Sequence, residues 1–220
     1  MEPSLAAVNS LCLTYEGRDK LARFFQFGSR AVMGFTAESS KASMRDVSTN
    51  ARNLMVSLAA ARRAFRFGRE LPVILSIPKA WHLPDLLDRV MELSQKVTLL
   101  MFFGIDHIGW LQQIRLLRSG RLRGVGTVQL GLKWLTLSML IATLCSARDW
   151  WRLRTTKSEG EEEKGKQQLQ QQCKVGVVRN FFMAVQVAHL SRLLETHDAF
   201  VGTLGMITSV IDLETVWPKR

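Results

Sequence analysis

Apolar residues recur at helical spacing between Ala51 and Arg69 (ARNLMVSLAAARRAFRFGR). At 100° per residue, four of them share one narrow stripe: Leu54, Leu58, Ala61 and Phe65. The same reading places five arginines on the opposite side, with no acidic residue between them: Arg52, Arg62, Arg63, Arg66 and Arg69. An apolar stripe opposite a basic face is typical of a helix at the surface of an anionic membrane. It also fits a basic helix on another polyanion, or a bundle helix with one solvated face.

The helical spacing continues on both sides of this segment. Before it, residues 14–35 are predicted to form a helix, with Thr14 as the candidate N-cap. The central amphipathic helix is expected over about residues 44–70. After it, residues 71–85 contain three of the five prolines of the chain. Because proline lacks an amide donor and interrupts a helix, we expect a bent connector there.

The next part of the chain is more apolar. A helical pattern resumes from residue 85 to about 117, where Asp106 and His107 interrupt an apolar run. Residues 128–147 are the best candidate for a membrane span. A span needs about 20 mostly apolar residues, and this stretch holds a single charge, Lys133.

The C-terminal third alternates between polar and apolar segments. Two tryptophans lie among arginines at 148–154, as they do at a membrane interface. Residues 157–172 are charged and glutamine-rich, which predicts an exposed linker. Helices are expected again at 175–194 and 199–217. The second of these contains small residues whose spacing favours close helix packing: Ala199, Gly202 and Gly205.

The sequence therefore predicts an all-α protein in which amphipathic helices precede membrane-embedded helical hairpins. Four regions are expected: an N-terminal amphipathic region (1–84), a membrane-associated hairpin (85–156), the exposed linker (157–173) and a C-terminal membrane hairpin (174–220).

The net charge of +11 is unevenly distributed along the chain. Residues 1–156 hold 22 basic against 11 acidic residues, whereas residues 157–220 hold 8 of each. The excess therefore indicates an anionic partner for the first part, either acidic lipid headgroups or nucleic acid. Nucleic acid is the less favoured of the two. The chain has one tyrosine, and its aromatic residues gather in apolar runs instead of forming base-stacking platforms.

The sequence shows no motif for catalysis or metal binding. The four histidines and three cysteines have no metal-ligand or redox spacing: His82, His107, His189, His197, Cys12, Cys145 and Cys173. Nucleophile elbows and phosphate-binding glycine loops are also lacking. We therefore expect a protein that is not an enzyme and that uses neither a metal nor a cofactor.

Four blocks of the sequence resemble the peroxin-11 family, membrane proteins that proliferate peroxisomes. They are GRDKLARFFQFGSRAV at 17–32, SLAAARRAFRFGRE at 57–70, FFGIDHIGWL at 102–111 and VGTLGMITSVIDLETVWPK at 201–219. The blocks come in the family's order and span nearly the whole chain. The first one carries the family's opening motif: Gly17, Arg18, Asp19, Lys20 and Phe24.

The resemblance implies an all-helical protein of the peroxisomal or glycosomal membrane, with both termini in the cytosol. Such a protein curves and elongates the organelle membrane, assembles with copies of itself, and recruits a dynamin-type fission GTPase with its tail-anchored adaptor. A pore for small metabolites is the alternative function. The family's membrane-remodelling helix matches residues 51–69, which assigns lipid binding to Arg52, Leu54, Leu58, Arg62, Arg63, Phe65, Arg66 and Arg69. Four charged or polar residues within apolar runs leave the number of spans open: Asp106, His107, Arg179 and Asp212.

Overall fold

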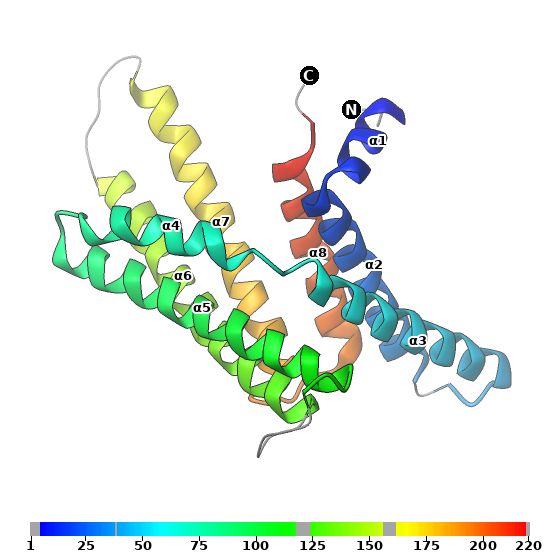
Figure 1. Cartoon of the computed structure of the whole chain (residues 1–220). Coiled ribbons are helices and arrows are strands. Elements are labelled where there is room, and N and C mark those ends of the chain that lie inside the picture. Colours follow the sequence, from blue (N-terminus) through cyan, green and yellow to red (C-terminus); the bar gives the residue numbers. More distant parts are fainter. Residues whose placement is uncertain (1–4, 38, 118–123, 156–161, 219–220) are drawn as a thin grey trace. The chain divides into compact units, whose positions relative to one another are not determined.

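The computed structural model describes residues 5–37, 39–117, 124–155 and 162–218, and within these residues the chain forms eight helices and no strand (Figure 1). The helices are α1 (Leu5–Leu13), α2 (Tyr15–Thr36), α3 (Ala42–Ala64), α4 (Glu70–Trp81), α5 (Leu86–Gln113), α6 (Val125–Thr155), α7 (Glu162–Leu190) and α8 (Asp198–Val216). The prediction of an all-α fold is therefore confirmed.

The helices form two compact units, which divide the chain differently from the four expected regions. The first unit comprises Met1–Phe67 with Leu194–Arg220, and the second comprises Gly68–Leu193. Within the second unit α7 packs on α6, and within the first unit α8 packs on α2.

Small residues explain why α8 pairs with α2. A Cβ atom added to Gly202 would lie 2.3 Å from the backbone nitrogen of Ala31, and one added to Gly34 would lie 2.2 Å from that of Ala199. The two backbones therefore come into direct contact, as the spacing of small residues predicted. Since Arg23 meets Asp212 near one end and Gly34 meets Ala199 near the other, α2 and α8 run antiparallel.

The second unit is built on α5, α6 and α7, with α4 against α5. Its core contains Phe102, Phe103, Leu135, Met139, Ala184 and Val187. Asp85 caps α5 by accepting hydrogen bonds from the backbone N–H groups of Leu87 and Asp88. Helix α5 packs along α6.

Three predicted element boundaries are wrong. The expected helix 44–70 ends at Ala64, and Gly68 adopts a positive φ of 83° in the turn that follows. The expected connector 71–85 is largely the helix α4. Its first proline, Pro72, lies in the opening turn, where no amide donor is required, and Pro78 is accommodated inside the helix. The apolar residues around these prolines still form one helical segment.

The third boundary concerns the predicted linker at 157–172. Residues 157–161 lie outside the described residues, but residues 162–172 belong to α7. Glutamine, glutamate and lysine are good helix formers, so a polar segment can continue an apolar helix without a core of its own.

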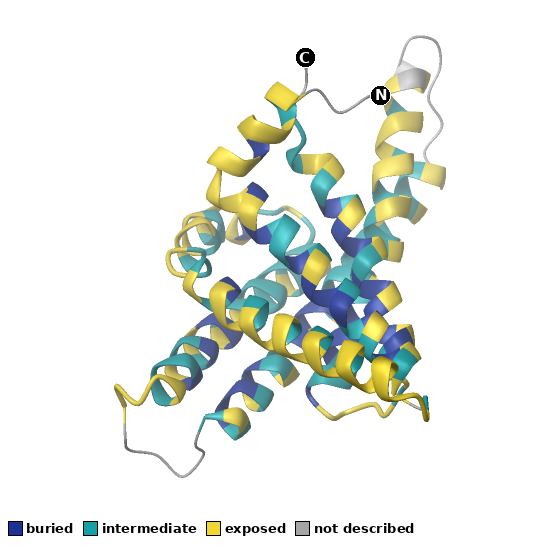
Figure 2. Ribbon diagram, turned by 90° about the vertical axis from the view of Figure 1, so that its right-hand side faces the viewer, coloured by how far each residue is buried: buried dark blue, intermediate teal, exposed yellow. Residues whose placement is uncertain are grey.

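Two of the described helices are long and apolar enough to cross a membrane, α6 and α8. In α6, 22% of the apolar window is buried inside the protein, against 44% in α8. Figure 2 shows exposed residues running as stripes along the helices.

Candidate membrane-binding surface and the polar network behind it

Helix α3 contains most of the predicted lipid-binding residues, and it packs on α2 along one side. Less exposed positions recur at helical spacing on that side: Ser48, Ala51, Met55, Leu58, Ala59 and Arg62. All of α3 is described by the structure, and among its residues Arg62 alone is buried. The contact of α3 with α2 is therefore shallow, and α3 has no fully buried apolar side chain.

The predicted lipid-binding residues do not all lie on one surface. Arg52 and Leu54 are exposed, Leu58 and Arg63 are half-buried, and Arg62 is buried. Phe65 and Arg66 follow the end of α3, and Arg69 belongs to the second unit, where it precedes α4. The structure therefore places Arg52, Leu54, Leu58, Arg62 and Arg63 on α3 itself.

Arg62 does not belong to a solvated arginine face, which corrects the expectation from its spacing. Its Nε donates to Oδ1 of Asp19 at 2.9 Å, and its Nη1 donates to Oε1 of Gln26 at 2.7 Å. Burial lowers the pKa of Arg62 to about 9, although the neighbouring carboxylate of Asp19 opposes this shift. The side chain therefore stays charged at neutral pH and fastens α3 to α2.

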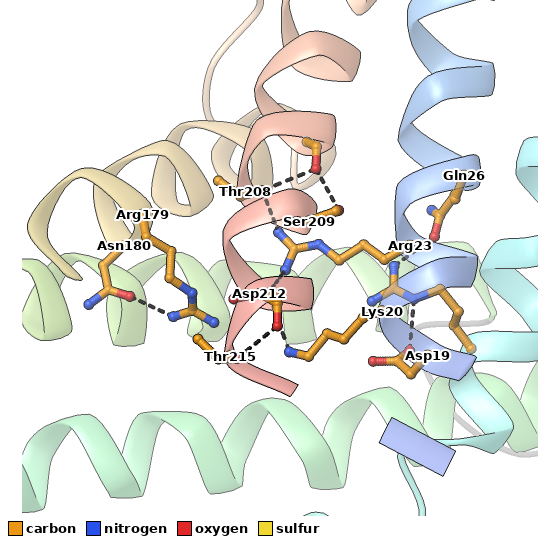
Figure 3. A network of polar contacts seen from close by, with 12 residues as sticks. Asp19, Lys20, Arg23, Gln26, Arg179, Asn180, Thr208, Ser209, Asp212 and Thr215 are labelled. Carbon is orange, nitrogen blue, oxygen red and sulfur yellow. Dashed lines mark hydrogen bonds and ion pairs between the residues drawn. The ribbon is translucent and has the colours of Figure 1, made fainter. Parts of the chain in front are cut away.

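A second group of charges joins α2 to α8. Arg23 donates to Oδ2 of Asp212 at 2.6 Å and to the hydroxyl of Thr208 at 2.8 Å. The ammonium of Lys20 lies 3.3 Å from the same carboxylate oxygen (Figure 3). Asp212 is 2% exposed, so this carboxylate is held in the packed interior by its cationic partners.

The residues of the opening motif GRDK connect α2 to its neighbours. A Cβ atom on Gly17 would lie 2.0 Å from the carbonyl oxygen of Leu11, so only glycine fits against the end of α1. Asp19 binds α3 and Lys20 binds α8, whereas Arg18 is exposed. Phe24 is half-buried, with its ring edge-on to Phe25. Gly17, Asp19 and Lys20 thus connect α2 to α1, α3 and α8 respectively.

Sequence reasoning missed Arg23, Gln26 and Thr208 as members of this network. One signal was available, because Asp212 stands out as an acid within an apolar run. A second signal was the presence of Arg23 between apolar neighbours in α2. Their pairing was not predictable, because it joins positions 189 residues apart.

Helix α6 carries an apolar stripe that faces outward. Its members are exposed and spaced by seven residues: Leu130, Leu137, Leu144 and Trp151. Asp106, on the neighbouring α5, is 1% exposed, and its backbone packs against Gly131 of α6. Asp106 therefore belongs to the contact between α5 and α6. No group of three His, Cys, Asp or Glu residues in the described parts of the chain is placed to hold a metal.

Comparison with known proteins gives one match. The model of the family "Peroxisomal biogenesis factor 11 (PEX11)" matches residues 5–217, nearly the whole chain, and confirms the resemblance of the four sequence blocks. No curated protein and no solved structure matches the chain. The match makes it a protein of the peroxisomal membrane with a role in peroxisome proliferation, from a family of biogenesis factors and not of enzymes. With α2, α3 and α8 all inside the matched region, the chain belongs to the peroxisomal biogenesis factor 11 family.

Proposed function

We propose that this protein binds the cytosolic leaflet of the peroxisomal membrane through α3, and that this binding curves and elongates the membrane before fission. The observation that carries the proposal is the exposed apolar edge of α3. Val47 and Leu54 are 44% and 49% exposed, and they continue the stripe that includes Leu58. Exposed apolar residues at helical spacing on a basic helix fit the boundary between headgroups and acyl chains.

Basic residues lie on the same helix, on the side opposite this apolar edge. Arg45 and Arg52 are exposed, and Arg63 is half-buried. Each basic residue near an anionic leaflet contributes about 1 kcal/mol of binding. The binding of α3 therefore weakens as salt increases, because salt screens the attraction between arginine and phosphate.

Insertion by α3 is shallow, at about 5–10 Å depth, so it expands one leaflet only. At high surface density this asymmetry favours a curved membrane. The exposed stripe of α6 supplies the anchor that holds α3 at the surface, since four large apolar residues face outward along it. We propose that the termini face the cytosol and that copies assemble with one another. In this arrangement the assembled copies and their cytosolic termini are accessible to the dynamin-type GTPase and its tail-anchored adaptor, as the family resemblance implies.

The test compares two valines of α3. Val47 belongs to the stripe, whereas Val56 is 55% exposed on the other side of the same helix. Val47→Glu combined with Leu54→Glu is expected to abolish peroxisome elongation on overexpression. Each substitution removes about 1.5–3 kcal/mol of apolar burial and adds a charge that the bilayer repels.

Val56→Glu adds the same charge outside the stripe and is the matched control. It should elongate peroxisomes as the unmodified protein does. Fluorescence microscopy measures organelle length, and both variants must remain on peroxisomes for the comparison to count. Equal elongation by the stripe variant and the control would show that α3 is not the element that curves the membrane.

A further inference from the structure

We propose that α2 covers part of the lipid-binding surface of α3 in this structure, and that phospholipid phosphate replaces Asp19 as the partner of Arg62 when α3 moves onto the membrane. This inference rests on the proposed function. It concerns the surface of α3 formed by Ala51, Met55, Leu58 and Ala59. In this structure α2 covers that surface, and after release an anionic bilayer covers it.

The apolar stripe of α3 is divided between two surroundings. Leu54 and Ala61 are exposed, whereas Leu58 is half-buried on the side of α3 that meets α2. Lipid can therefore reach only one edge of the stripe while α3 lies on α2. Full insertion of Leu58 requires α3 to leave α2.

The contact between α3 and α2 that must break has no fully buried apolar side chain on α3, and its ion pair adds little net stability. Arg62 is 8% exposed, and the other residues of α3 that face α2 are half-buried. Because burying a pair of charges costs solvation, such a pair contributes little net stability to the contact. If both partners become solvated together, no charge is left buried and uncompensated.

Arg62 has a reason to accept phosphate in place of Asp19. Its guanidinium lies in the positive field of Arg23 and Arg66, with Asp19 as its carboxylate partner. A phosphate group offers the same geometry to a guanidinium as a carboxylate does. The exchange therefore preserves an ion pair for Arg62 and adds apolar contacts for Met55 and Leu58.

The first unit allows α3 to leave while α2 stays in place. Arg23 of α2 is bound to Asp212 and Thr208 of α8, and none of these groups belongs to α3. Gly68 follows α3 with a positive φ of 83°, and no atom lies within 4 Å of the place where its side chain would be. We therefore expect α3 to separate from α2 while the pair of α2 and α8 remains intact.

The experiment uses the full chain with its three native cysteines replaced by serine. Spin labels on cysteines introduced at Val32 of α2 and Asn53 of α3, both exposed, measure the separation of the two helices. In a second preparation, a polarity-sensitive fluorophore at position 54 reports contact with lipid. Each protein is reconstituted into vesicles of phosphatidylcholine alone, or of equal parts phosphatidylcholine and phosphatidylserine.

In the protein with unmodified Asp19 and Arg62, the distances between the two spin labels should be narrowly distributed in neutral vesicles. In anionic vesicles the distances should be longer and more broadly distributed. Asp19→Asn removes the counterion of Arg62, so the population with α3 released should rise about tenfold or more without anionic lipid. Asp46→Asn is the matched control, because it removes one negative charge from an exposed site on α3 itself. It should behave as the parent protein.

A second variant distinguishes release of α3 from a general loss of folding. Asp19→Arg with Arg62→Asp restores a pair of opposite charges but places at position 62 a group that phosphate repels. If the neutral-vesicle distance equals that of the parent, the contact has re-formed, and anionic lipid should then fail to lengthen it. Hydrogen exchange in α8 should stay protected in every variant.

The outcomes separate this inference from the proposed function. An unchanged distance in anionic vesicles, while position 54 reports lipid contact, would overturn the release of α3 and leave membrane binding intact. Equal distances for Asp19→Asn and Asp46→Asn would also overturn it. Release of α3 with position 54 remaining in water would support the exchange at Arg62 but contradict lipid insertion by the stripe.

Discussion

At the scale of single residues, aspartates mark the points where helices join. Asp19 fastens α3 to α2, Asp212 fastens α2 to α8, and Asp85 lies where the start of α5 meets the end of α6. The three differ in surroundings, because Asp19 and Asp212 are each 2% exposed whereas Asp85 is half-buried. Only Asp85 combines helix capping with ion pairing, to Arg148 and Arg152.

Asp85 predicts a loss of stability in acid. The hydrogen bond from the backbone N–H of Asp88 lowers the pKa of Asp85 below its ordinary value of 3.8, and Arg148 lowers it further. A carboxylate with a lowered folded-state pKa stabilises the fold above its unfolded-state pKa, and this contribution disappears as pH falls through the folded-state value. The stabilisation is therefore complete at neutral pH, begins to decline near pH 3.8 and is lost below the lower folded-state pKa.

Asp85→Asn tests this assignment, because asparagine still caps a helix but carries no charge. At pH 7 the variant should melt a few degrees below the parent protein, measured by circular dichroism in mild detergent. The difference between the two melting temperatures should shrink towards zero as pH falls below 3.8. A difference that stays constant across this range would mean that the charge of Asp85 does not stabilise the fold.

At the scale of elements, helix formation followed from the sequence but the choice of partners did not. Thr14 caps α2 by accepting from the backbone N–H of Gly17, as its position before the helical pattern predicted. The helical spacing also located α5, α6 and α8. Pairing of α8 with α2, however, depends on glycine and alanine contacts between distant segments, which a periodicity along one segment does not encode.

The packing of the helices predicts that alanine has opposite effects on stability at two glycines. A Cβ atom on Gly205 of α8 would lie 2.1 Å from the ring of Phe27, which is buried, whereas one on Gly104 of α5 would meet nothing within 4 Å. Gly205→Ala should lower the free energy of unfolding by about 1–3 kcal/mol through overpacking. Gly104→Ala should raise it by about 0.4–1 kcal/mol, since alanine restricts the unfolded chain at an open helical site.

Denaturant titration of both alanine variants in the same detergent measures this difference. Each variant makes the same chemical change inside a helix, so the sign of the effect depends on the space around the site. If Gly205→Ala proves as stable as Gly104→Ala, α8 does not approach α2 closely at Gly205.

At the scale of the whole molecule, the candidate site was predicted only in part. The exposed residues Arg52 and Leu54 were identified from spacing alone. Arg62 was misplaced, because a helical wheel does not show that Asp19, 43 residues earlier, supplies its partner. The end of α3 was also missed, since helical spacing of Phe65, Arg66 and Arg69 continues by coincidence through a turn.

Membrane attachment of the whole molecule is predicted to depend on the outward stripe of α6. Leu137→Arg with Leu144→Arg should release the protein from carbonate-washed membranes. Each arginine at the centre of a span costs about 2.5–3.5 kcal/mol. Leu169→Arg is the control, because Leu169 is also exposed but lies in the polar first part of α7. Immunoblots of pellet and supernatant would contradict the role of α6 if all three proteins stayed in the pellet.

The pairing of α8 with α2 has a consequence for fragments of this protein. A piece that ends after α3 lacks Asp198 and Asp212, so Arg23 and Lys20 lose the carboxylate that they share, and Arg30 loses its own partner. The same piece uncovers the backbone around Ala31 and Gly34, against which α8 fits. Such a fragment presents more positive charge and more bare helix surface than the identical residues do in the full chain. Its affinity for lipid would therefore overstate that of the intact protein.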